Sequence, residues 1–145
     1  MSEQRPKRIH LLGSGRHEEG IAGATITPGM LIALNSDGEY IPHGTSGIAA
    51  ERNFALEDAL QGRTIADNYT EGELVGFVAC VPGDVVFAFL ADGEVVDIGD
   101  KLVSNGDGRL QKLNSSEIPL GVALEAVDLS ESENIAAARI RVRLL

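Results

Sequence analysis

Short apolar runs alternate with glycine-containing turns along most of the chain. Runs rich in Val, Ile and Leu are typical of strands, and Asp-Gly turns supply the positive φ angles of tight hairpins. The clearest case is residues 30–34, the turn at 35–38 and residues 39–41, which together predict a hairpin. The same pattern predicts further strands at 21–27, 46–54, 74–81, 85–91, 95–98, 101–104, 109–113, 120–127 and 137–144.

Two stretches depart from this pattern. Residues 1–7 are polar and lack periodicity, and three glycines follow before residue 21. We therefore predict a flexible N-terminal arm at 1–20 and a single β-rich domain at 21–145. Residues 8–12 have an alternative role, as the first strand of the protein's own sheet. Residues 55–60 suggest one or two turns of helix, ended by Gly62 and followed by a polar loop up to Gly72.

Two parts of the chain also share one arrangement of turns and strands. The pattern of residues 29–32, 37–38 and 47–51 recurs at 99–102, 107–108 and 121–125. The interval from the first Gly to the Asp is the same in both copies, and the next interval differs by four residues. A unit used twice predicts a pseudo-symmetric barrel or sandwich, while chance similarity between hairpins is the alternative. Both interpretations give an all-β fold.

The composition agrees with one small β domain. The chain has 145 residues, 17 of them Gly, and its hydrophobic fraction is 43% with only 4% aromatic residues. We expect an all-β fold, a small barrel or tulip-like domain with short hairpins and little helix. The single Cys80 has no partner for an internal disulfide, and its apolar surroundings predict a small buried side chain. Residues 1–8 do not resemble a signal peptide, and no run approaches the ~20 apolar residues of a membrane span, so we expect a protein made and kept in a cytoplasm without a membrane partner.

The net charge of −10 is unevenly distributed. Residues 1–16 and 139–145 each carry +3, whereas residues 17–138 hold five basic and twenty-one acidic residues, a net charge of −16. An acidic body repels phosphate backbones, which argues against a nucleic-acid partner. The basic ends are suited to an acidic partner or to the protein's own body. In the last strand, Arg139, Arg141 and Arg143 alternate with apolar residues, which predicts one buried face and one cationic stripe.

A search for reactive groups gives no recognisable catalytic apparatus, and we expect neither an enzyme, a metal site nor a cofactor. The glycine loop at 13–16 lacks the spacing of a phosphate-binding loop, and no serine lies in a nucleophile elbow. The aspartates beside glycines fit turns better than calcium loops. His10, His17 and His43 have neither the spacing nor the Cys companions of a zinc site.

One alternative is a biotinyl or lipoyl carrier domain. The segment 99–103, with Lys101 in a glycine-rich hairpin context, looks like the lysine turn of those carriers. In carriers the modified lysine lies at an exposed hairpin tip. Here the tip falls at 105–108, which leaves Lys101 on a strand.

The sequence as a whole resembles the head decoration, or cement, proteins of tailed bacteriophages. The resemblance rests on the polar N-terminal arm and on the segments 27–32, 99–103 with its Asp-Gly hairpin, and 119–126. It implies a compact β fold of tulip or barrel type, commonly a homotrimer, bound to the major capsid protein on the outer surface of the virion after synthesis in the host cytoplasm.

This resemblance implies a structural role, in which the protein stabilises the capsid by bridging its subunits. We expect the arm to add a strand to a capsid sheet edge while its basic groups meet acidic capsid residues. The capsid-binding residues are then Arg5, Lys7, Arg8, Ile9, Leu11 and Leu12. The alternatives are the carrier domain, another small β-barrel binding domain, and an enzyme subunit whose active site a partner completes.

Overall fold

The computed structural model describes residues 5–45, 51–113, 117–130 and 138–145. It confirms the predicted all-β class: antiparallel strands dominate, and the sheets do not close into a continuous barrel. The hairpin predicted around the turn at 35–38 is present, whereas residues 46–50 of a predicted strand lie outside the described residues. The strands are β1 (His10–Leu12), β2 (Arg16–Ile21), β3 (Leu31–Leu34), β4 (Tyr40–Pro42), β5 (Asn53–Ala55), β6 (Leu74–Ala79), β7 (Val85–Phe89), β8 (Val95–Val96), β9 (Lys101–Ser104), β10 (Leu110–Lys112), β11 (Gly121–Ala123), β12 (Val127–Asp128) and β13 (Arg139–Leu144).

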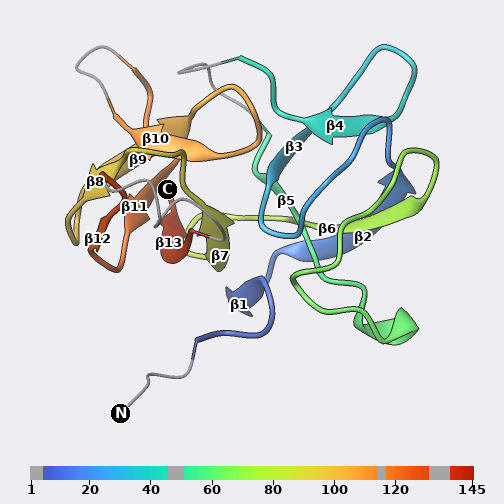
Figure 1. Ribbon diagram of the computed structural model, residues 1–145, viewed down its shortest axis with the longest axis horizontal. Coiled ribbons are helices and arrows are strands. Elements are labelled where there is room, and N and C mark those ends of the chain that lie inside the picture. Colours follow the sequence, from blue (N-terminus) through green and yellow to red (C-terminus); the bar gives the residue numbers. More distant parts are fainter. Residues whose placement is uncertain (1–4, 46–50, 114–116, 131–137) are drawn as a thin grey trace.

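The strands form two main sheets that lie side by side (Figure 1). The first has the order β2-β6-β5-β3-β4, and the second has the order β1-β7-β13-β11-β9-β10. A short ribbon of β8 and β12 belongs to the second part of the chain. We call residues 16–79 the first half and residues 85–144 the second half.

The two halves have one topology, which confirms the predicted repeat. Apart from β1, the strands correspond in order: β2 with β7, β3 with β9, β4 with β10, β5 with β11, and β6 with β13. Both hairpin turns place a glycine at positive φ, with φ of 79° at Gly38 and 84° at Gly108. Residues 47–50 of the first repeat lie outside the described residues.

Matching backbone contacts fix the register of the two halves. After β2, Ala22 forms a parallel bridge with Tyr40; after β7, Leu90 forms the same bridge with Leu110. In both halves the next residue donates a backbone hydrogen bond of 2.8 Å across that bridge. Ala22 therefore corresponds to Leu90, and in each half the chain that leaves β2 or β7 meets the hairpin strand β4 or β10.

The main core lies between the two sheets. Leu31, Phe54 and Val78 from the first sheet pack in one cluster with Val86 and Ile140 from the second. These apolar side chains alternate along their strands with residues that point to the opposite face. The core thus joins both halves into a single unit.

A smaller core covers the opposite face of the first sheet. It includes Ile32, Ala55 and Phe77, the chain neighbours of the residues that face the main core, together with Tyr69. Successive strand residues point to opposite faces, so the first sheet is buried on both sides. The loop that carries Tyr69 supplies the second cover.

The predicted flexible arm at 1–20 is corrected for the residues from 9 onward. Strand β1 pairs with β7, and β2 pairs with β6 along its whole length. Ile9 is 0% exposed and belongs to the main core. The alternative left open by the sequence, a first strand in the protein's own sheet, is the one observed.

The segment at 55–72 is only marginally helical. Ala55 ends β5, and the expected helix is limited to the 3-10 turn η1 (Ala59–Gln61). Gly62 ends this turn, as predicted, and adopts the left-handed conformation. This segment packs beside the first sheet and forms one wall of the groove described below.

Candidate functional site

A buried carboxylate organises the region where β1 turns into β2. Asp84 is 1% exposed and accepts hydrogen bonds from the backbone N–H groups of Gly15, at 2.9 Å, and Val81, at 3.3 Å. A Cβ on Gly13 would lie 1.8 Å from one Asp84 oxygen, and a Cβ on Gly15 would lie 2.2 Å from the other. Residues 13 and 15 must therefore be glycines, because Asp84 lies too close to leave room for a side chain. The Gly15 N–H, which could otherwise bind an external anion, already donates to Asp84.

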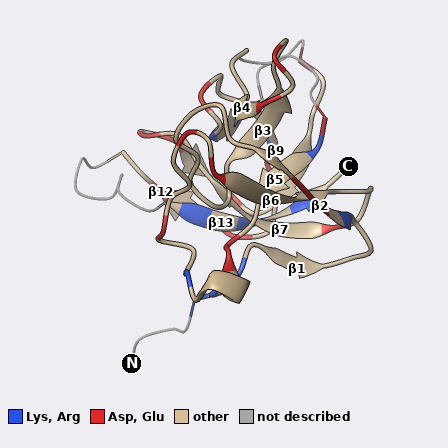
Figure 2. Cartoon of the chain, turned by 90° about the vertical axis from the view of Figure 1, so that its right-hand side faces the viewer, with Lys and Arg blue, Asp and Glu red and all other residues tan. Residues whose placement is uncertain are grey.

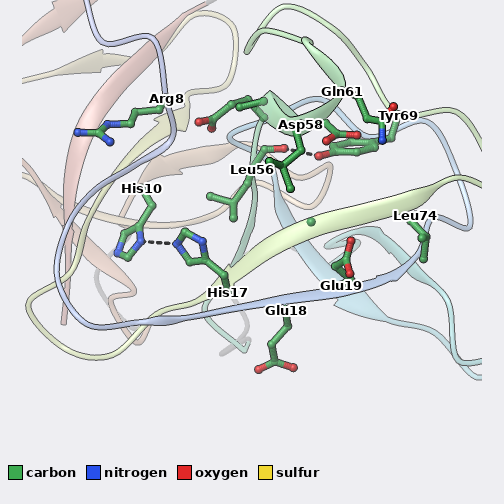
Figure 3. Close-up of a pocket in the computed structure, with 14 residues that line it drawn as sticks. Arg8, His10, His17, Glu18, Glu19, Leu56, Asp58, Gln61, Tyr69 and Leu74 are labelled. Carbon is green, nitrogen blue, oxygen red and sulfur yellow. Dashed lines mark hydrogen bonds between the residues drawn. The ribbon is translucent and has the colours of Figure 1, made fainter.

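Two histidines continue this network toward the surface. Nε2 of His10 lies 3.5 Å from an Asp84 oxygen, and Nδ1 of His10 lies 2.8 Å from Nε2 of His17 (Figure 3). Nε2 of His10 is buried without a hydrogen-bond partner among the described residues, and which ring donates in the His10–His17 bond is set by the tautomers of the two rings. The cluster Asp84–His10–His17 thus connects the turn before β7 with β1 and β2. Sequence spacing did not reveal it, because Asp84 follows an ordinary Pro-Gly turn.

A groove of about 510 Å³ begins at this histidine pair. It lies between the 56–61 segment and the strands β2 and β6 (Figure 3). Its apolar wall includes Leu60, whose side chain is 99% exposed, and Leu74, at 58%. Its acidic lining residues are Glu18, Glu19, Glu57 and Asp58, against a single arginine, Arg8.

The groove wall is held by polar contacts of the loop beneath it. The Tyr69 hydroxyl donates to the Leu56 carbonyl at 2.7 Å, and burial raises the Tyr69 pKa to about 12. Glu73 accepts from Arg63 at 2.9 Å and from the Thr70 backbone at 2.7 Å. The hydrogen bond from Arg63, followed by those from Thr70, lowers the Glu73 pKa to about 2.

The predicted cationic residues of the arm lie on the protein's own surface. Arg5 binds Glu125 through both guanidinium nitrogens and lies 5.3 Å from the centre of the Phe87 ring. Burial opposes the effect, but the hydrogen bond from Arg5 leaves the Glu125 pKa lowered. Lys7 is exposed, and Arg8 lines the groove.

The predicted apolar residues of the arm separate into two environments. Ile9 lies inside the core, and Leu11 is partly buried against it. Leu12 is 63% exposed at the end of β1. Of these three side chains, Leu12 is therefore the one that presents most of its surface to a partner.

The predicted cationic stripe of β13 is largely occupied within the fold. Arg139 is buried, donates to the carbonyls of Pro28 and Ile65, and stacks 4.2 Å from the centre of the Phe89 ring. Arg141 lies 3.4 Å from Glu125, while Arg143 is exposed. Figure 2 shows these basic positions along β13, in the middle of the fold.

Three other sequence-predicted residues are placed as follows. Cys80 is partly buried against the main core, and burial, followed by the charge of Asp84, raises its pKa to about 12. Lys101 begins β9 and is exposed on the strand, away from the 105–108 turn. His43 is buried and its Nδ1 lies 2.6 Å from the Ser104 hydroxyl.

Within the described ranges, no group of three or more His, Cys, Asp or Glu side chains is arranged to hold a metal ion. Among the described residues there is no helix that is long and apolar enough to cross a membrane.

Comparison with known proteins gives a match in structure alone. No protein-family model matches the chain, and no curated protein sequence matches it. Among solved structures, the chain is similar to the N base of head fiber gp8.5 in bacteriophage phi29, with a TM-score of 0.59 and 11% sequence identity. The alignment covers 91% of this chain and 95% of that chain. At this identity the likeness shows that the two chains share a fold.

Proposed function

We propose that this chain is a structural protein of a bacteriophage head, which binds the outer capsid surface and bridges neighbouring major capsid subunits. The observation that supports this most is the fold shared with a head fiber base over nearly the whole of both chains. The turn and strand motifs of the sequence resemble decoration proteins independently of that match. The acidic body suits an exposed particle surface, since net charge limits association between particles.

The capsid-facing surface is the exposed part of the N-terminal segment. Lys7 and Leu12 are exposed, whereas Ile9 holds the segment in the core. Because the segment is already anchored, it loses less conformational entropy on binding the capsid than a free arm would lose. Three copies in a homotrimer multiply such weak contacts through effective concentration.

The test is co-sedimentation of the purified protein with capsids of the phage whose genome encodes it. We expect saturable binding that weakens as salt rises and that falls when Lys7 is changed to Glu. Lys101→Glu is the matched control, because Lys101 is also exposed and lies on a different strand. Absence of co-sedimentation at low salt contradicts the proposed function.

Two further measurements separate the remaining alternatives. Light scattering tests the homotrimer, and a monomer at micromolar concentration contradicts it. Intact mass after expression in the native host tests the carrier alternative, in which Lys101 gains the mass of a biotinyl or lipoyl group.

A further inference from the structure

The two halves of the fold differ at one edge. In the second half, β1 covers the outer side of β7, and the Phe87 N–H donates to the Ile9 carbonyl at 2.8 Å. In the first half, β2 is the edge strand, and none of the described residues pairs with its outer side. Within the described part of the chain, no strand takes the position that β1 has beside β7, and we call this position vacant.

The register identifies the vacant position. Ala22 corresponds to Leu90, so Glu19 corresponds to Phe87, three residues before each bridge. In β6, Gly76 directs its carbonyl toward Leu56, away from β2. Glu19 pairs with Gly76, so the antiparallel alternation directs the N–H and C=O of Glu19 outward, together with those of His17. We call this outward side of β2 at residues 17–19 the vacant edge.

The vacant edge borders the groove. His17, Glu18 and Glu19 all line the cavity, and Leu60 and Leu74 provide exposed apolar surface beside it. An extended segment paired with β2 gains main-chain hydrogen bonds at the edge and places alternate side chains against the groove. Four acidic residues around the cavity favour a segment with basic side chains.

We propose that the vacant edge of β2 and the adjoining groove bind an extended segment of a partner protein, one that carries basic and apolar residues. The segment that leads into and forms β1 is a model for such a partner, since residues 7–12 read Lys-Arg-Ile-His-Leu-Leu and β1 itself is His10–Leu12. This inference does not depend on the proposed capsid role, because it rests on the internal repeat and on the groove.

The test uses the full chain and a synthetic peptide with the sequence of residues 6–13. Glu19→Pro removes the outward N–H while leaving the pairing with β6, and Glu19→Ala removes the side chain but keeps that N–H. We expect saturable binding to the parent protein, and binding to Glu19→Pro about tenfold weaker than to Glu19→Ala, as for loss of one hydrogen bond. A peptide in which Lys7 and Arg8 are replaced by Glu should also bind about tenfold more weakly.

A second pair of variants covers the case in which Glu19→Pro fails to fold. Leu60→Ser changes a fully exposed side chain in the groove wall, and Ile98→Ser changes an exposed side chain outside the groove. We expect weaker peptide binding for the first and unchanged binding for the second. Equal binding by Leu60→Ser and Ile98→Ser overturns the proposal.

Three other outcomes also overturn it. The first is no saturable binding of the peptide to the parent protein. The second is a set of NMR shift changes confined to β7, which would show that the peptide replaces β1. The third is self-association of the protein that Glu19→Pro abolishes and the peptide does not compete with, which would make this edge an interface between copies.

Discussion

Replacing Asp84 by Asn tests whether one buried carboxylate holds β1, β2 and β7 together. The change keeps the shape and removes the charge. Asp84 accepts from the N–H groups of Gly15 and Val81 through the same oxygen and faces His10 Nε2 at 3.5 Å. An asparagine oxygen in the position of that oxygen keeps these contacts as a neutral acceptor, and its NH₂ group then takes the position of the other carboxylate oxygen, buried beside Gly13.

Two effects oppose each other in this variant. Removing the charge removes its desolvation cost, which favours the variant. Against this, a hydrogen bond to a charged acceptor contributes about 1 kcal/mol more than one to a neutral acceptor, and a buried NH₂ group left without a partner costs about 1–3 kcal/mol. Because two amides and a histidine face one carboxylate that is 1% exposed, the loss prevails, and we expect a net destabilisation of about 2–3 kcal/mol.

The assay is thermal and urea unfolding of Asp84→Asn against the parent protein. For a domain of this size the expected loss lowers the melting temperature by roughly 6–12 °C. The Gly15 amide should also exchange with solvent faster, since its acceptor becomes neutral and the hydrogen bond weaker. Asp37→Asn is the control: Asp37 lies in an exposed Asp-Gly turn that accepts Asn equally, and its effect should stay within about 0.5 kcal/mol. Equal stability of the Asp84 and Asp37 variants refutes the reasoning.

Three further predictions concern single side chains. Ile9→Ala should cost about 2–5 kcal/mol in urea unfolding because Ile9 is fully buried, whereas Leu12→Ala, at an exposed position, should change stability little; similar values would show that β1 is not docked. The lowered pKa of Glu73 adds stability that is fully present above its ordinary pKa of 4.5 and is lost as the pH falls toward about 2; Glu73→Gln should flatten this part of the pH–stability curve, more visibly at low salt. Cys80, with a pKa raised to about 12, should react with iodoacetamide at pH 8 roughly a hundredfold to a thousandfold more slowly in the native protein than in urea, and equal rates would contradict its burial.

The sequence predicts the parts of this fold that depend on local chemistry. The Asp-Gly turns at 37–38 and 107–108 require positive φ wherever the chain places them, so both hairpins and the repeat of 29–38 in 99–108 were visible without a structure. The burial of Cys80 against the main core was likewise indicated by its apolar neighbours in the sequence. These features need no knowledge of distant residues.

The parts that depend on long-range pairing were not predictable in the same way. Strand β2 reads Arg-His-Glu-Glu-Gly-Ile, which has almost no apolar alternation, and β7 reads Val-Val-Phe-Ala-Phe. Their correspondence is therefore invisible in sequence, although both occupy the same place in their sheets. Ile9 and Asp84 are important because of partners more than sixty residues away, and a Pro-Gly-Asp turn gives no sign that its carboxylate is buried.

A free N-terminal arm could bind a capsid both by donating a strand and by charge contacts, but the pairing of β1 with β7 makes strand donation costly. A disordered arm could donate its own strand to a capsid, but β1 already has its strand partner in β7, and unpairing it exposes Ile9. Exposure of one such side chain costs about 1.5–3 kcal/mol, which a capsid edge has to recover before any gain. The exposed basic residue Lys7 is free of that cost. Charge contacts from the N-terminal segment to an acidic surface, and acceptance of a basic strand at β2, are thus compatible in one folded molecule. They use opposite charges at different places, since Lys7 precedes β1 and the acidic residues lie around the groove beside β2.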